Sequence, residues 1–330
     1  DLHKEYRRQR QMCIRDRMCT GIFIKTKDGK FIFARTLEFG VYLKWKQFCS
    51  LKIKGTIGHF DNVKEGFMTD GLNSNGLFVG TFFFPHNDKQ YPTERDPNKI
   101  NLETGDVNLY LLQNCKNVAD VITLVSSLNI LETKLQDQLF SLHWLVCDKS
   151  GLCVVLEMKN KELIIYRNPY NVITNSPAFP EQVKNVNKYK FLSKYNKPDS
   201  ISEGSGALGM PGDSTSMSRF VRAHFFRKNM VVPENTKIGM EAALRILHNF
   251  DIPYGSVEDK QTGKKEVTEY TVAYSLNDNK VKYAPYGYVI DKNNEWKQSD
   301  NPVKKCVGDT KDIFFSLVTV VGLILMYKCR

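Results

Sequence analysis

The stretch MCTGIFIKTKDGKFIFART occupies residues 18–36 and decides how the amino-terminal part of the chain folds. Two runs rich in β-branched and aromatic residues flank Asp28-Gly29. Asp-Gly between such runs is typical of a β-hairpin. The pattern therefore predicts two antiparallel strands, with Cys19 at the head of the first and Arg35 near the end of the second.

The rest of the chain continues with strands and a smaller number of helices. We expect a strand–turn–strand unit over 67–84, turned by Asn73, Asn75 and Gly76, and a helix over 107–130. Further strands are predicted within 142–158, 162–168, 171–175 and 268–290, and helices over 216–230 and 237–250. This order predicts an α+β fold with mainly antiparallel sheets covered by helices.

Composition narrows the classes of function. Hydrophobic content of 42% and charged content of 25% are typical of a folded domain. The net charge is +11, but no arginine-rich helix or aromatic-basic ladder is present, so we expect no nucleic-acid partner. None of the eight cysteines has CxxC spacing, which argues against a zinc site, and we expect neither a metal nor a cofactor. This cysteine pattern favours a reducing compartment, hence the cytoplasm, with a periplasmic or secreted location as the alternative if a signal peptide is missing.

Both ends of the chain differ from the part between them. Residues 1–17 lack the apolar core of a signal peptide, and we interpret them as a non-native or removed leader. Residues 18–305 are predicted to form one domain, followed by an apolar tail over 306–330. The apolar run 313–327 is shorter than the roughly 20 residues of a membrane span. A buried strand, a tail anchor and a mistranslated end all stay open, and a membrane contact is expected only through this tail.

The dipeptide Met18-Cys19 carries the first chemical signal. Removal of the methionine would leave Cys19 with a thiol and a free α-amine. An α-amine has a pKa of about 7.7–8.0, so it can take the proton as the thiol attacks. Arg35 could supply a permanent positive charge across the hairpin. Met12-Cys13 offers the same dipeptide, but it leads into no foldable segment.

Five ordered segments between Met18 and Tyr288 resemble the choloylglycine hydrolase family, which includes bile salt hydrolases and penicillin V acylases. They are MCTGIFIKTKDGKFIFART, DGLNSNGL (70–77), ITNSPAF (173–179), LGMPGDSTSMSRFVR (208–222) and TEYTVAYS (268–275). The resemblance implies a four-layer αββα sandwich of the N-terminal-nucleophile hydrolases. It also implies cleavage of a linear amide and a homo-oligomer, a tetramer by family resemblance.

The same resemblance implies a role for each matching residue. Cys19 matches the nucleophile and its own base, and Arg35 matches an arginine beside the thiol. Glu38 falls where the family usually has an aspartate that hydrogen-bonds the terminal amine, and it keeps that charge on a side chain one methylene longer. Arg219 matches a second active-site arginine.

The resemblance also implies an oxyanion hole. Asn175 matches its side-chain donor, and Phe83 falls at the position whose backbone N–H supplies the second donor. Phe83 replaces the family's usual asparagine or tyrosine, but only the backbone group is needed. Loss of one such donor typically costs about 10²–10³ in turnover.

Each of these residues has a structural alternative. Arg35 and Glu38 could form a surface ion pair worth at most about 1 kcal/mol. Asn175 could be a turn residue, and Arg219 could pair with Asp213. Their joint occurrence in family order favours catalysis. We interpret Asn73, Gly76 and Asp70 as structural residues.

The substrate is less constrained by the sequence. Aromatic side chains that could line an acyl pocket are Tyr42, Trp45, Phe82, Phe83 and Phe84. A conjugated bile salt, penicillin V or another N-acyl amide would suit such a lining, and an N-acyl homoserine lactone is the alternative. A catalytically inactive amide-binding homologue and a cysteine enzyme that needs no processing also stay open.

A Cys-His protease is the obvious competing mechanism. His143 lies in an apolar predicted strand and His224 on a predicted helix. We expect both to be structural, with His143 hydrogen-bonded in the core.

Overall fold

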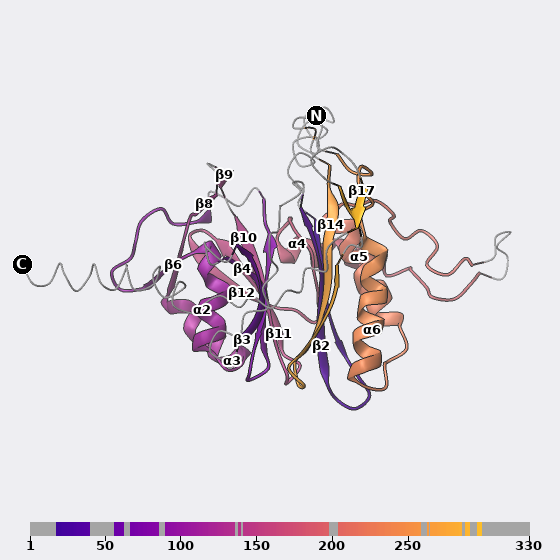
Figure 1. Cartoon of the computed structure of the whole chain (residues 1–330), viewed down its shortest axis with the longest axis horizontal. Coiled ribbons are helices and arrows are strands. Elements are labelled where there is room, and N and C mark those ends of the chain that lie inside the picture. The colour runs from indigo at the N-terminus through magenta and orange to yellow at the C-terminus, as the bar shows by residue number, and fades with distance from the viewer. Residues whose placement is uncertain are drawn as a thin grey trace, which may run out of the picture.

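The computed structural model describes the backbone of most of the chain between Met18 and Gln298 (Figure 1). The described residues are 18–39, 56–62, 67–85, 90–135, 138–139, 141–197, 204–258, 263, 265–285, 288–290 and 296–298. The leader 1–17 and the tail 306–330 lie outside them, and so does the apolar run 313–327.

The first sheet is built around the amino-terminal hairpin. In spatial order its five strands are β13 (Val172–Ile173), β1 (Cys19–Lys25), β2 (Phe31–Phe39), β14 (Val267–Ser275) and β15 (Lys280–Pro285). The predicted hairpin is confirmed, with Cys19 opposite Leu37 and Lys25 opposite Phe31 in antiparallel register. Every pairing in this sheet is antiparallel.

The second sheet has six strands, also all antiparallel. In spatial order they are β12 (Glu162–Arg167), β11 (Cys153–Lys159), β10 (Leu142–Asp148), β5 (Leu77–Phe83), β4 (Phe67–Asn73) and β3 (Thr56–Asn62). The predicted turn between β4 and β5 is confirmed. Asn73 Oδ1 accepts from the backbone N–H of Asn75 and Leu77, and Gly76 adopts a φ of +85° that suits glycine.

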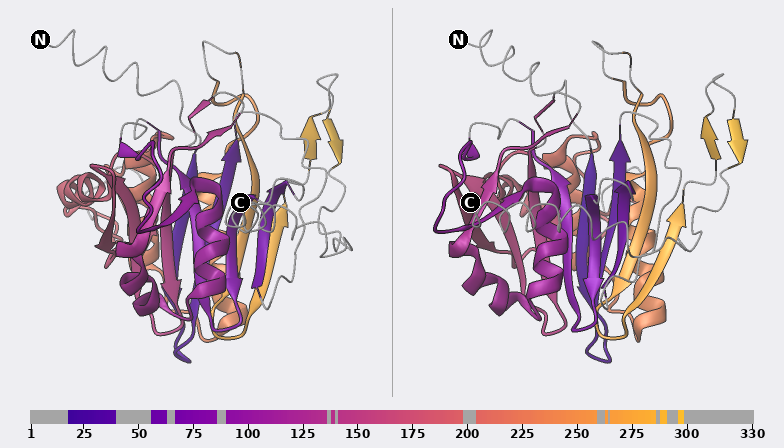
Figure 2. Two further views of the ribbon diagram at one scale, coloured as in Figure 1. Left: turned by 90° about the vertical axis from the view of Figure 1, so that its left-hand side faces the viewer. Right: turned by 60° about the vertical axis from the view of Figure 1, so that its left-hand side comes forward.

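The two sheets stack face to face between helices (Figure 1). Helices α5 (Ser216–Asn229) and α6 (Thr236–Leu247) cover the first sheet, and α2 (Val107–Asn114) and α3 (Val118–Leu124) cover the second. The further views show the strands of both sheets running in nearly the same direction (Figure 2). The predicted α+β fold with four αββα layers is therefore confirmed.

One predicted element was wrong in extent. The helix expected over 107–130 is divided at Cys115, whose backbone is extended. The Asn117 side chain then caps the start of α3 by accepting from the Asp120 N–H. Asparagine is favoured at this capping position, so a new helix begins here. Residues Leu128–Leu131 form strand β7, which pairs with β6 (Ile100–Glu103).

The remaining elements are short. They are β6 (Ile100–Glu103), β8 (Lys134–Leu135), β9 (Gln138–Leu139), β16 (Tyr288–Ile290), β17 (Trp296–Gln298), α4 (Phe179–Val186) and the 3₁₀ turns Thr104–Asp106, Val125–Ser127, Asn187–Tyr189 and His248–Phe250.

Buried apolar side chains form two clusters that hold the layers together. One joins the first sheet to α5 and α6 and to the inner face of the second sheet. There Phe33 of β2 stacks on Phe78 of β5, with ring centroids 4.0 Å apart. The other lies between the second sheet and α2 and α3. The head of β1 and the end of β5 therefore belong to facing sheets of one packed core.

Candidate active site

Cys19 begins β1 and is only 2% exposed. Its backbone N–H donates to Asn175 Oδ1 at 2.7 Å, and its carbonyl accepts from Arg219 Nη1 at 2.5 Å. These partners lie 156 and 200 positions away in the sequence. The tertiary fold therefore brings Cys19, Asn175 and Arg219 together, and their catalytic roles stay predictions from the family resemblance.

The Cys19 thiol is in a mixed electrostatic environment. Burial raises its pKa, the positive charge of Arg35 lowers it, and the neighbouring Glu38 carboxyl raises it. The net effect is a raised pKa, so the thiol is protonated at neutral pH and needs a base before it can attack. While Met18 precedes Cys19, the nearest nitrogen is a peptide amide and has no basic lone pair.

Arg35 is a fully buried cation of β2. Its Nη1 donates to the Thr81 carbonyl at 2.6 Å and to the Thr69 carbonyl at 3.2 Å. The same nitrogen lies 3.6 Å from Asp70 Oδ2, and the guanidinium lies over the Phe82 ring at 4.4 Å. Nη2 has no hydrogen-bond partner among the described residues. A buried guanidinium thus keeps one unpaired hydrogen-bonding edge.

Glu38 is 1% exposed, and its carboxyl is mostly protonated at physiological pH. Burial raises the pKa of its carboxyl to about 8, against the opposing effects of Arg219 and a hydrogen bond from Thr36. Oε1 accepts from Thr268 Oγ1 at 3.2 Å, whereas Oε2 has no partner within the described part of the chain. The surface-ion-pair alternative for Arg35 and Glu38 is wrong, because both side chains are buried.

Arg219 projects from α5 onto the head of β1 and is 2% exposed. Besides the Cys19 carbonyl, it donates to Thr20 Oγ1 at 2.9 Å and, through Nη2, to Asn175 Oδ1 at 2.8 Å. The alternative pairing with Asp213 is wrong. The Asp213 carboxylate instead accepts from the Thr215 N–H and the Ser218 hydroxyl, within the turn that starts α5.

Asn175 links Cys19 to the end of β5. Its Oδ1 accepts from Cys19 and Arg219, and its Nδ2 donates to the Phe83 carbonyl at 2.8 Å. Phe84 donates its N–H to Ser141 of the neighbouring segment, so the alternating peptide groups place the Phe83 N–H and C=O on the opposite edge of β5, toward Asn175. Asn175 is 1% exposed, which makes it more than a surface turn residue.

The aromatic residues expected to line an acyl pocket divide into two groups. Tyr42 and Trp45 lie outside the described residues. Phe82 and Phe84 are 0% and 4% exposed, and they pack against Arg35 and His143 respectively. The structure therefore places these two in the support of the site, and substrate contact through them stays a prediction.

The histidines have the structural roles that the sequence indicated. His143 is buried, and its ring nitrogens face Glu157 Oε1 and the Thr174 carbonyl oxygen. His224 is a half-buried residue of α5 with its ring edge against Tyr170. The contacts of His143 thus identify it as a hydrogen-bonded core residue.

Asp70 has a larger role than the sequence suggested. Its fully buried carboxylate accepts from the Tyr270 hydroxyl at 2.7 Å and also from Tyr274, both on β14. Together with the Arg35 contact, Asp70 of β4 therefore connects the two sheets beneath the site. No local signal marks Tyr270 or Tyr274, because they approach Asp70 only through sheet stacking. Within the described residues, no group of histidine, cysteine and carboxylate side chains could hold a metal ion.

Comparison with known proteins agrees with this geometry. The model of linear amide C–N hydrolases of the choloylglycine hydrolase family matches residues 19–293, beginning at the proposed nucleophile. The chain belongs to this family. It is thus an enzyme of the class of C–N hydrolases that act on linear amides.

Several relatives support the assignment. An uncharacterised protein of Paramecium bursaria Chlorella virus 1 is 37% identical, over 82% of this chain and 97% of its own length. A bile salt hydrolase/transferase of Clostridium perfringens is 27% identical, over 78% of this chain and 86% of its own.

Two solved structures have the same fold as this chain. A variant of the conjugated bile acid hydrolase from Clostridium perfringens matches with a TM-score of 0.72 and 25% identity, covering 88% of this chain and 100% of that one. Penicillin V acylase from Agrobacterium tumefaciens shares the fold, with a TM-score of 0.64 and 18% identity over 82% and 83% of the two chains. Among the described residues, no helix is both long and apolar enough to span a membrane.

Proposed function

We propose that this linear amide hydrolase uses the Cys19 thiol as its nucleophile and the α-amine of the same residue as its base. The observation that carries the proposal is the convergence of Asn175 and Arg219 on the backbone of a buried cysteine at a strand head. The raised pKa of the thiol supports it, because such a thiol needs a base. A free α-amine with a pKa of about 7.7–8.0 would lie within the same residue.

The proposed reaction has two steps. The α-amine takes the thiol proton while sulfur attacks the amide carbon, and the carbonyl oxygen becomes an oxyanion. The resulting ammonium then protonates the leaving amine, which departs and leaves a thioester on Cys19. Water, deprotonated by the same amine, hydrolyses the thioester and frees the acid and the thiol.

The surrounding residues have distinct proposed roles. One hydrogen of Asn175 Nδ2 is bonded to the Phe83 carbonyl, and the other would join the Phe83 N–H in stabilising the oxyanion. Glu38, whose Oε2 is unpaired, would accept from the freed amine, and Arg35 would favour the thiolate. Arg219 would hold the Cys19 carbonyl and the Asn175 oxygen in place.

The proposed substrates are amides that join an acyl group to an amino acid or a β-lactam nucleus. Relatives named bile salt hydrolase and penicillin V acylase support this class. A decisive panel contains glycine- and taurine-conjugated bile acids, phenoxymethyl penicillin and an N-acyl homoserine lactone. Turnover of none of them by a protein with a free Cys19 amine would favour an inactive amide-binding homologue.

The test of the nucleophile compares two cysteines. Cys19→Ser should remain folded and lose almost all turnover of the panel, and Cys13→Ser should match the wild type. The opposite result, an inactive Cys13→Ser and a fully active Cys19→Ser, would refute the assignment. Amino-terminal sequencing of the purified enzyme shows whether Cys19 is exposed, which separates this mechanism from that of a cysteine enzyme without processing.

A further inference from the structure

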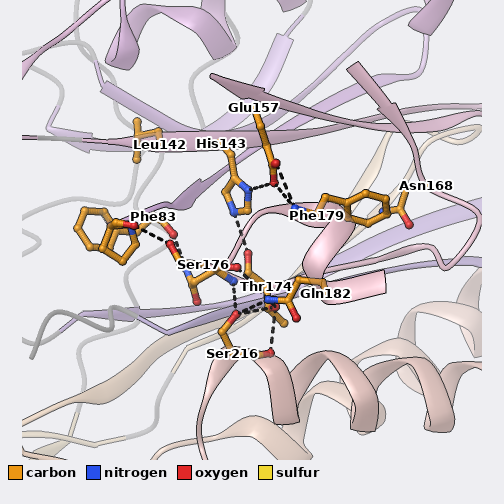
Figure 3. A network of polar contacts seen from close by, with 12 residues as sticks. Phe83, Leu142, His143, Glu157, Asn168, Thr174, Ser176, Phe179, Gln182 and Ser216 are labelled. Carbon is orange, nitrogen blue, oxygen red and sulfur yellow. Dashed lines mark hydrogen bonds and ion pairs between the residues drawn. The ribbon is translucent and has the colours of Figure 1, made fainter. Parts of the chain in front are cut away.

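His143 contacts both segments that would form the oxyanion hole. It is the second residue of β10, lies opposite Phe82 of β5 and is 2% exposed. Nε2 lies 2.9 Å from the Thr174 carbonyl oxygen. The ring stacks on Phe84 with centroids 4.4 Å apart and an interplanar angle of 15°. Figure 3 shows the ring between Glu157 and Thr174.

The contact with Thr174 fixes one particular peptide group. The peptide unit that joins Thr174 to Asn175 is held at both ends, because its oxygen faces His143 and its N–H donates to Ser216 Oγ at 2.9 Å. Gln182 Nε2 donates to the next carbonyl, that of Asn175, at 3.1 Å. A rotation of this peptide plane would redirect the Asn175 side chain, so these bonds set where Nδ2 points.

The end of β5 is tied to the same segment. Asn175 Nδ2 donates to the Phe83 carbonyl, and Ser176 Oγ donates to the Pro85 carbonyl at 2.7 Å. Phe84 lies between Phe83 and Pro85 in the sequence, and its ring stacks on the His143 ring. The imidazole is therefore in contact with both halves of the arrangement, by a hydrogen bond on one side and by ring packing on the other.

Glu157 orients the imidazole. Its Oε1 lies 3.1 Å from His143 Nδ1, and its two oxygens also accept from the Phe179 N–H at 2.9 and 3.1 Å. Both ring nitrogens of His143 thus face acceptors. A carbonyl oxygen can only accept, so Nε2 is the donor in the contact with Thr174.

We infer that His143 is a positioning residue that sets the distance between the Asn175 and Phe83 donors of the oxyanion hole. The inference rests on the proposed function, since it assigns His143 to the same site. His143 would not touch substrate. It would act through the Thr174–Asn175 peptide, and small displacements of oxyanion donors cost large factors in rate.

Two substitutions separate positioning from mere support of the core. The amide nitrogen of His143→Gln can replace Nε2 and still donate to Thr174, whereas that of His143→Asn can replace Nδ1 and donate only to Glu157. Two reagents then report on Cys19 of the processed chain, in which mass spectrometry shows that Cys19 is the first residue. 4-Nitrophenyl acetate acylates a thiol through a tetrahedral oxyanion, whereas iodoacetamide alkylates it by displacement and forms none.

We expect His143→Asn to slow acylation of Cys19 about tenfold or more, and to leave alkylation within about twofold of the wild type. His143→Gln should restore most of the acylation rate. His224→Gln, the matched loss of a histidine from α5, should change neither rate. If circular dichroism shows that His143→Asn does not fold, the double variant His143→Asn/Glu157→Gln replaces it, because it also removes the carboxylate that faced the ring. We expect the double variant to show the selective loss of acylation predicted for His143→Asn.

Three results would overturn the inference. They are an acylation rate of His143→Asn within twofold of the wild type, an equal fall in both rates, and a loss in His143→Gln as large as in His143→Asn. A wild-type protein in which neither reagent labels Cys19 would refute the proposed function itself. That outcome is recognisable because it appears before any substitution is made.

Discussion

Glu38→Gln should make the full chain more stable, by an amount that grows with pH. The pKa of the Glu38 carboxyl is about 8 in the folded chain against an ordinary value of 4.5, because burial outweighs its contacts. Between these two values the folded state keeps a proton that the unfolded state has released. The stability of the wild type therefore falls as pH rises through this window. Glutamine has the same shape and does not titrate, so the variant escapes this loss.

The size of the effect follows from the two pKa values. One pKa unit corresponds to about 1.36 kcal/mol, so the wild type loses about 1 kcal/mol at pH 5 and about 3 kcal/mol at pH 7. Any constant effect of the amide on packing cancels between the two conditions. The advantage of Glu38→Gln should thus grow by about 2 kcal/mol from pH 5 to pH 7 and level off above pH 8.

Urea denaturation at several pH values measures this directly. Both proteins should carry residue Met18, verified by mass spectrometry, so that the Cys19 nitrogen is an amide in each. Glu162→Gln, at the exposed start of β12, supplies the background effect of losing one carboxylate. A difference between Glu38→Gln and wild type that is the same at pH 5 and pH 7 would show that Glu38 is an ordinary charged carboxylate, contrary to our reasoning.

Three further predictions concern turnover. A chain that begins at Met18 should be active after methionine removal, whereas the full chain with 1–17 attached should be inactive; equal specific activity with an intact leader would rule out the free-amine base. With the amine free, Glu38→Gln should lower kcat by about 10- to 100-fold, equivalent to about 1.4–2.7 kcal/mol, and Glu38→Asp by less. A Gln variant within twofold of wild type at saturating substrate would remove Glu38 from the mechanism. Asn175→Ala should lower kcat by about 10²–10³, and a loss confined to KM would contradict its role as an oxyanion donor.

Local patterns predicted the parts of the fold that depend on neighbouring residues. The hairpin at Asp28-Gly29 and the turn at Gly76 follow from short-range geometry, and both are present. The prediction of one helix over 107–130 was wrong because the spacing of apolar residues does not reveal a helix cap. Asn117 caps the start of a new helix within this range. The residues from Leu128 to Leu131 then form a strand that pairs with β6.

The site shows a similar division. Asn175 and Arg219 were assigned through family resemblance, and the structure brings both onto Cys19. Burial of Glu38 and its raised pKa depend on the facing layers, which no local pattern contains. For the same reason the apolar pattern predicted that His143 lies in the core but could not indicate which peptide group its ring would contact.

The grip of Arg219 on Cys19 has a consequence for maturation. The guanidinium binds the carbonyl side of Cys19 and the side chain of Thr20, whereas the bond that would break in the proposed maturation lies on the other side of Cys19. The Arg219 contacts and the proposed cleavage therefore lie on opposite sides of one residue. Cutting the chain before Cys19 breaks neither contact, so the sulfur can keep its place while its nitrogen changes from amide to amine. If the chain matures as proposed, activation would need only the change of one functional group, with no refolding of the site.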